Sequence, residues 1–239
     1  MIDLYYAPTP NGWKAAIMLE ECGLEYRLNL MQLSKGDQFT PEFLAVSPNA
    51  KMPAIVDHDP PADWGPGPVT VFESGAILLY LAEKTGQFAP PETDRRARKE
   101  LMEWLFWQVG NQGPMGGQLS HFRNYAPEDD RAYGFKRYLG EYDRNLGVLE
   151  NRLQGRDWIL DEYSIADMLA FPWAFIAKPL GASLDDFPNV AAWRGRIKTR
   201  PGVQRAIDLK KADQNRGQVR VDNNDVLFNQ TAAALRPGG

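Results

Sequence analysis

The beginning of the chain constrains its fold most. Residues 2–6 (Ile-Asp-Leu-Tyr-Tyr) are typical of a buried strand, and residues 7–12 (Ala-Pro-Thr-Pro-Asn-Gly) form a turn. Residues 12–22 then have helical spacing, and Gly23 follows as a natural C-terminal cap. The first N–H groups of a helix are unpaired and carry partial positive charge, so they favour an anion. Thr9 and Asn11 lie beside these groups, and the sequence therefore predicts an anion site at this turn.

The rest of the first 86 residues alternates strand and helix patterns. We expect strands at 26–30, 54–57 and 69–72, and helices at 41–44 and 76–85. Residues 59–68 hold four prolines and two glycines, which indicates a surface turn. The element order is βαβ, a crossover, two strands and a helix. It predicts a small mixed sheet with helices on its faces, an α/β domain over residues 1–86.

After a linker at residues 87–94, only helical periodicity follows. It covers residues 94–109, 131–153, 164–178 and 190–199, which predicts a separate all-helical domain over residues 93–210. Ser164 and Asp167 match a helix capping box. The glycines and proline within residues 110–117 predict a broken or widened helix near a cleft. Residues 211–239 are polar and weakly patterned, and we expect an irregular C-terminal tail there.

Composition excludes several kinds of protein. The formal net charge of −4 argues against nucleic acid as a partner. One cysteine excludes an intrachain disulfide framework, and two histidines argue against a His/Cys zinc site. The longest apolar run, residues 168–177, is far shorter than the ~20 residues of a membrane span, and no secretory leader pattern precedes the first strand. We therefore expect a cytoplasmic protein without a metal, a membrane or a nucleic acid partner.

Five motifs carry a resemblance to a known family. They are residues 7–12, 47–55 (Ser-Pro-Asn-Ala-Lys-Met-Pro-Ala-Ile), 72–81 (Phe-Glu-Ser-Gly-Ala-Ile-Leu-Leu-Tyr-Leu), 104–108 (Trp-Leu-Phe-Trp-Gln) and 163–167 (Tyr-Ser-Ile-Ala-Asp). Together they resemble the cytosolic glutathione transferases, in particular the bacterial Nu class. The resemblance implies the glutathione transferase fold: a thioredoxin-like α/β N-terminal domain that binds glutathione, plus an all-α C-terminal domain. Residues 211–239 depart from the family pattern.

The resemblance implies how the first domain holds glutathione, an acidic tripeptide with a thiol. Met52 and Pro53 match the cis-proline turn of the family, which exposes the Met52 backbone to pair with the tripeptide as a short strand. Glu73 and Ser74 stand at a strand-to-helix junction, where Ser74 would hold the γ-glutamyl carboxylate and Glu73 the α-ammonium group. Without the resemblance, a trans proline in an ordinary loop and Ser74 as a plain helix cap beside a solvated Glu73 are open alternatives.

Three further residues complete the implied glutathione site. Lys51 and Gln38 would bind the glycyl end, with Lys51 acting as a point charge on the carboxylate. Arg137, on a helix of the second domain, matches the position where relatives place an arginine towards glutathione carboxylates. A solvated lysine or arginine without a ligand is the alternative for Lys51 and Arg137.

The sulfur chemistry must come from the ligand, because no cysteine occupies the turn where thioredoxin-like redox proteins carry a reactive thiolate. A free thiol has a pKa near 8.5, and lowering it by about two units needs about 2.7 kcal/mol. Hydrogen bonds from Thr9, Asn11 and the helix N–H groups can supply this, although both residues can also cap the helix. Tyr5 or Tyr6 is a competing activator. Cys22, about three turns away, is expected to be a quiet buried thiol.

A second site is suggested by aromatic residues in the first two helices of the helical domain. We expect most of them to serve core and dimer packing and the remainder to line a pocket for an electrophile. They are Trp104, Phe106, Trp107, His121, Phe122, Tyr125, Tyr133 and Tyr138.

The activity implied by the resemblance is glutathione-dependent disulfide-bond reduction, in which the bound thiolate, stabilised by Thr9 and Asn11, attacks a disulfide. Conjugation of glutathione to electrophiles and aryl-ether cleavage are alternatives within the same family. A non-catalytic binding protein that keeps the fold is the alternative of another class. The implied partners are glutathione as co-substrate, a disulfide or an electrophilic small molecule, and a second copy of the chain in a homodimer.

Overall fold

The computed structural model of the chain describes residues 1–209, 224–228 and 230–235. These residues form two compact units. The first consists of Met1–Thr85 with the described residues that follow Arg200, and the second is Gly86–Arg200. The expected division into 1–86, 93–210 and 211–239 stays a prediction. The units differ from it because helix α9 (Pro201–Asp208) packs on α1 (Pro10–Cys22) in the first unit.

A four-stranded mixed sheet forms the centre of the first unit, as predicted. Its strand order is β2-β1-β3-β4; β1 is parallel to β2 and antiparallel to β3, and β4 is antiparallel to β3. Tyr5 pairs with Ala54, which pairs with Phe72. The ends of β1 and β4 therefore lie at the same edge of the sheet as the start of β3. The strands are β1 (Ile2–Tyr6), β2 (Tyr26–Leu30), β3 (Ala54–Asp57) and β4 (Val69–Phe72).

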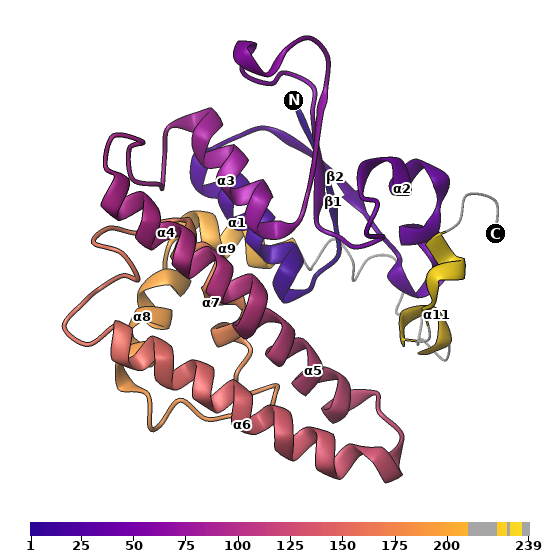
Figure 1. Ribbon diagram of the computed structural model, residues 1–239, viewed down its shortest axis with the longest axis vertical. Helices are drawn as coiled ribbons and strands as arrows, with labels where there is room; N and C mark the ends of the chain where they lie inside the picture. Colours follow the sequence, from indigo (N-terminus) through magenta and orange to yellow (C-terminus); the bar gives the residue numbers. More distant parts are fainter. Residues whose placement is uncertain (210–223, 229, 236–239) are drawn as a thin grey trace. The chain divides into compact units, whose positions relative to one another are not determined.

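Helices cover both faces of this sheet, and Ile2, Leu4 and Tyr6, which alternate along β1 and so share one face, are buried. Helices α1 and α3 (Ser74–Thr85) pack against each other on one face (Figure 1). Tyr5, pointing to the other face, contacts Phe43 of α2 (Pro41–Val46), with 5.4 Å between the ring centroids. The short 3₁₀ helices of this unit are η1 (Leu33–Lys35), η2 (Asp37–Phe39), η3 (Ala62–Trp64) and η5 (Ala232–Leu235).

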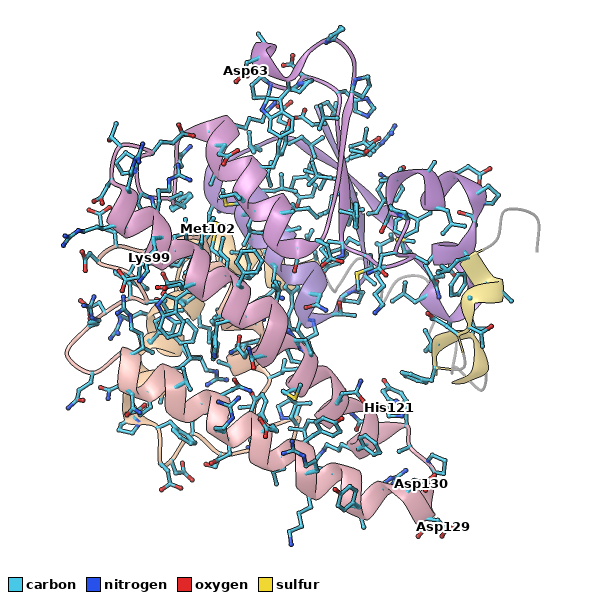
Figure 2. The ribbon with its side chains drawn as sticks, viewed as in Figure 1. Asp63, Lys99, Met102, His121, Asp129 and Asp130 are labelled. Atoms are coloured by element: carbon cyan, nitrogen blue, oxygen red, sulfur yellow. The ribbon has the colours of Figure 1, made fainter. Side chains whose placement is uncertain are left out.

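The second unit is helical throughout its regular structure, as predicted. Helices α5 and α6 pack side by side (Figure 1). Helix α6 begins with acidic residues, among them Asp129 and Asp130 (Figure 2), which complement its dipole. Its helices are α4 (Arg95–Trp107), the π-helix η4 (Gln108–Gln112), α5 (Gly113–Asn124), α6 (Glu128–Arg152), α7 (Ile165–Phe175) and α8 (Pro188–Lys198).

The stretch at residues 110–117 is widened, as predicted, because η4 is a π-helix. The expected break is absent in the described chain, since α5 continues directly from η4. Gly116 serves close packing instead, whereas Gly110 has open space around it. A Cβ atom on Gly116 would lie 2.5 Å from Cε3 of Trp173, so only glycine fits against that ring.

The capping box at α7 is confirmed. The Ser164 hydroxyl accepts from the Ala166 N–H, and the Asp167 carboxylate accepts from the Ser164 N–H at 3.0 Å. The predicted tail lies partly outside the described residues, at 211–223, 229 and 236–239. Where it is described, it forms α11 (Asn224–Phe228) and η5 rather than an irregular chain. Across the described ranges, no helix is long and apolar enough to cross a bilayer.

Candidate functional site

Three loops of the first unit meet at one edge of the sheet. They are the turn before α1 (residues 7–12), the loop before β3 (47–53) and the junction between β4 and α3 (72–74), which the register of β1, β3 and β4 brings together. Three side-chain contacts connect these loops and α1. They are Thr9 Oγ1–H to Met52 Sδ at 3.8 Å, Asn49 Nδ2–H to Glu73 Oε1 at 3.2 Å and Lys14 Nζ–H to Ser74 Oγ at 3.4 Å.

The turn before α1 is held by its own backbone. Thr9 is extended, with φ −120° and ψ 162°, and its hydroxyl accepts from the Gly12 N–H at 3.2 Å. A Cβ atom on Gly12 would lie 2.2 Å from the Ala7 carbonyl oxygen, so a glycine is required for this approach. The capping role of Thr9 is thus confirmed. Contact of Thr9 and Asn11 with a ligand sulfur stays a prediction.

The peptide bond between Met52 and Pro53 is cis, as the resemblance implied. The Ser47 hydroxyl donates to the Lys51 carbonyl at 2.9 Å and holds the loop just before it. Within the described part of the chain, the Met52 N–H and C=O have no hydrogen-bond partner. A backbone segment whose N–H and C=O groups are unpaired can form hydrogen bonds with an extended peptide.

Glu73 has a left-handed backbone, with φ 70°, at the junction of β4 and α3. Its carbonyl accepts from the Ile77 N–H at 2.9 Å, so Glu73 takes the capping position and Ser74 is the first helical residue. The alternative in which Ser74 is the plain cap of α3 therefore does not hold. The N–H and hydroxyl of Ser74 lie at the positive end of the helix dipole, where they suit a carboxylate.

Lys14 is the residue at this edge that sequence reasoning missed. Its side chain lies on α1 and is only 2% exposed. Burial lowers the pKa of Lys14 to about 7, while the charge of Glu73 acts in the opposite direction. The signal was present in the sequence, because Lys14 interrupts the apolar run 13–19 within the first helix.

The two residues expected at the glycyl end differ in burial. Gln38 lies on η2 and is buried, and its Oε1 atom has no hydrogen-bond partner among the described residues. A donor on a bound peptide would satisfy this acceptor. Lys51 is exposed, as expected for a surface point charge. The contact of Gln38 and Lys51 with a ligand stays a prediction.

The competing activators have structural contacts instead. Tyr6 is fully buried in the core, and Tyr5 packs on Phe43. Cys22 lies at the far end of α1, where its Sγ is 3.7 Å from the Thr85 hydroxyl. Burial raises the pKa of the Cys22 thiol, which disfavours a thiolate.

In the second unit, Arg137 pairs with Glu141 on the same helix, with 2.7 Å between Nη1 and Oε1. The predicted glutathione contact of Arg137 stays a prediction.

The eight aromatic residues expected to serve core and dimer packing or to line a pocket lie on α4, α5 and α6 or directly after α5. None of the eight is in the buried core, and Phe106 and Tyr133 are 66% and 81% exposed. His121 of this group lies near the end of α5 (Figure 2). Packing of these residues in a dimer, or around an electrophile, stays a prediction.

No group of three or more histidine, cysteine or acidic residues in the described ranges is placed to hold a metal ion. The donors assembled at the sheet edge are instead a hydroxyl, helix N–H groups and a buried lysine, which together suit an anionic ligand with a peptide backbone.

Two family models match the chain. "Glutathione S-transferase, N-terminal domain" matches residues 2–83, and "Glutathione S-transferase, C-terminal domain" matches residues 125–201. The chain is 51% identical over 208 residues to the disulfide-bond oxidoreductase YfcG of Escherichia coli, covering 87% of this chain and 94% of that protein.

Two solved structures are similar to this chain. One is a glutathione transferase from Burkholderia graminis with two glutathione molecules bound per subunit; it has a TM-score of 0.80 and 45% identity, covering 87% of each chain. The other is a glutathione transferase from Pseudomonas putida with one glutathione disulfide bound per subunit. It has a TM-score of 0.78 and 40% identity, covering 87% of this chain and 91% of that one.

Proposed function

Because the chain belongs to the glutathione S-transferase family, we propose that it is a glutathione-dependent disulfide-bond reductase. Bound glutathione supplies the thiolate, and the start of α1 stabilises it. The observation that carries this proposal is the turn at residues 7–12, which places Thr9 and Asn11 at the N-terminus of α1 but contains no cysteine. The relative named a disulfide-bond oxidoreductase and the similar structures that bind glutathione or its disulfide support it.

The reaction balances with two molecules of glutathione. The first thiolate attacks one sulfur of the substrate disulfide, forms a mixed disulfide and releases the other sulfur as a thiolate, which takes a proton from solvent. A second glutathione thiolate then attacks the glutathione sulfur of the mixed disulfide. This step forms glutathione disulfide and releases the remaining substrate thiol. Two glutathiones are oxidised and one substrate disulfide is reduced.

We assign the rest of the tripeptide to receptors at the same sheet edge. The Met52 backbone pairs with the cysteinyl segment, the N–H and hydroxyl of Ser74 donate to the γ-glutamyl carboxylate, and Glu73 complements the ammonium group. Gln38 and Lys51 bind the glycyl end. The family resemblance separately assigns Arg137 to a glutathione carboxylate, and in this structure Arg137 pairs with Glu141.

The test is the rate of glutathione-dependent reduction of a small disulfide in variants of Thr9 and Asn11. A hydrogen bond to a charged group contributes about 1.5–3 kcal/mol, so Thr9→Ala or Asn11→Ala should lower turnover roughly 10- to 100-fold. The apparent pKa of the pH–rate profile should rise, because the thiolate loses stabilisation. Wild-type rates in both variants would refute the proposal.

Two further Thr9 variants separate the reaction from helix capping. Thr9→Ser keeps the hydroxyl and should retain activity. Thr9→Asp keeps a good helix cap but places a negative charge beside the sulfur, so it should remain folded and lose turnover. An aryl halide assayed in parallel distinguishes attack on sulfur from conjugation to carbon.

We also propose that the protein acts in the cytoplasm as a homodimer, with a disulfide-containing small molecule as second substrate. The family resemblance and the exposed aromatic residues Phe106 and Tyr133 support an assembly between copies. Light scattering after size exclusion would give the mass directly, and a monomer at micromolar concentration would contradict the dimer.

A further inference from the structure

Lys14 is a buried lysine on α1, with 2% of its surface exposed. It is the only buried lysine in the described part of the chain, and apolar residues flank it along α1. Burying an ammonium group is costly unless it has a specific partner. One partner is Ser74, whose hydroxyl oxygen lies 3.4 Å from Lys14 Nζ.

Ser74 can direct its single hydroxyl proton in only one direction at a time. A charged Lys14 has three donors and no acceptor, so it must donate to Ser74 Oγ and leaves the hydroxyl proton free for another acceptor. A neutral Lys14 gains a lone pair, and the Ser74 hydroxyl can then donate to it. The protonation of Lys14 therefore decides whether the Ser74 hydroxyl serves a ligand or the lysine.

We propose that Lys14 is a positioning residue for glutathione: its ammonium group turns the Ser74 hydroxyl towards the γ-glutamyl carboxylate, so that only the protonated form binds the tripeptide tightly. This inference rests on the proposed function, because it assumes that glutathione occupies the site at Ser74. It adds a proton to the binding reaction, which the site residues assigned so far do not require.

The pH range follows from burial, which lowers the pKa of Lys14 to about 7. The negative charge of Glu73 acts in the opposite direction and raises the pKa of Lys14. Other titratable or charged groups on α1 and on the elements packed against it are Glu20, Glu21 and Cys22 of α1, Asp3, Tyr5 and Tyr6 of β1, Tyr80, Glu83 and Lys84 of α3, and Arg205 and Asp208 of α9.

The probe for this linkage is S-methylglutathione, which has no thiol proton to confuse the measurement. With a pKa of about 7, the protonated fraction of free Lys14 falls about tenfold between pH 6 and pH 8. Apparent affinity follows the competent fraction, so the dissociation constant should rise about tenfold over this range. Calorimetry at pH 8 in buffers of different ionisation enthalpy should detect uptake of nearly one proton per ligand.

Three variants sharpen the test. Lys14→Met, a replacement of similar volume, should bind more weakly and show neither proton uptake nor the pH dependence. Ser74→Ala leaves Lys14 in place but removes the group through which it acts, so it should also lose both effects, and it covers the case in which Lys14→Met does not fold. Lys51→Met, an exposed lysine of the same site, should weaken binding equally at pH 6 and pH 8 and keep the proton uptake.

The outcomes separate this inference from the proposed function. If the wild-type protein binds S-methylglutathione with the same affinity at pH 6 and pH 8, or if Lys14→Met retains the proton uptake, the role of Lys14 is refuted and the proposed function stands. If the wild-type protein does not bind the ligand at either pH, the proposed function fails together with it.

Discussion

Replacing Asp167 by alanine should lower the free energy of unfolding of the helical unit more than replacing an exposed aspartate that caps a helix. Asp167 is fully buried, and three N–H groups donate to its oxygens. They are the Ile159 N–H at 2.9 Å, the Ser164 N–H at 3.0 Å and the Trp193 Nε1–H at 2.7 Å. The carboxylate thus joins the segment before α7, the cap of α7 and helix α8.

The magnitude follows from the donors that the substitution leaves behind. A buried donor without a partner costs about 1–3 kcal/mol, so losing the acceptor of three such donors should cost about 3–9 kcal/mol. Burial raises the pKa of Asp167 to about 6, although its hydrogen bonds lower it, so the group is ionised at pH 7. The variant therefore also loses an acceptor of charge-assisted hydrogen bonds.

The assay is urea unfolding followed by tryptophan fluorescence at pH 7 and at one fixed protein concentration. Asp94→Ala is the matched control, because Asp94 caps α4 by accepting from the Ala97 N–H at 3.0 Å but is exposed. The control should cost about 0.5–2 kcal/mol. If Asp167→Ala costs no more than Asp94→Ala, the buried network does not carry the stability assigned to it.

Three other substitutions test the first unit. Cys22→Ala should leave glutathione-dependent disulfide reduction unchanged, since the reacting sulfur is not encoded in the chain, and a loss of turnover in the folded variant would contradict this. Gly12→Ala should lower the free energy of unfolding by about 1–3 kcal/mol and weaken glutathione binding, because its Cβ atom would lie 2.2 Å from the Ala7 carbonyl oxygen; calorimetry and urea unfolding measure both. Burial raises the pKa of Asp57, but hydrogen bonds, foremost that from Lys84, bring it below 3.8. The stabilisation of the folded state by the ionised Asp57 carboxylate is therefore present above about pH 4. It is lost as the pH falls through the pKa of Asp57 in the folded protein. Asp57→Asn should show a smaller loss of stability on acidification from pH 5 to pH 3 than the wild-type protein does.

The local sequence determined the regular elements of the chain and the place of its site. The four strands, the helix after the Thr-Pro-Asn turn and the capping box at Ser164 each depend on residues close together in the chain, so their periodicity and turn chemistry are visible without a structure. The sequence also shows directly that the turn at residues 7–12 contains no cysteine, and from this we inferred that the reacting sulfur belongs to a ligand.

The tertiary structure alone decided which of those residues are buried and what they contact. Lys14 belongs to a helix that the sequence predicts, but its burial and its contact with Ser74 depend on residues 60 positions apart. Contacts between distant segments also place helix α9 in the first unit, where it packs on α1, and leave the aromatic residues of α4–α6 outside the buried core. Burial, and the pKa shifts that follow from it, depend on packing between distant segments of the chain. The periodicity of a short stretch of sequence does not reveal that packing.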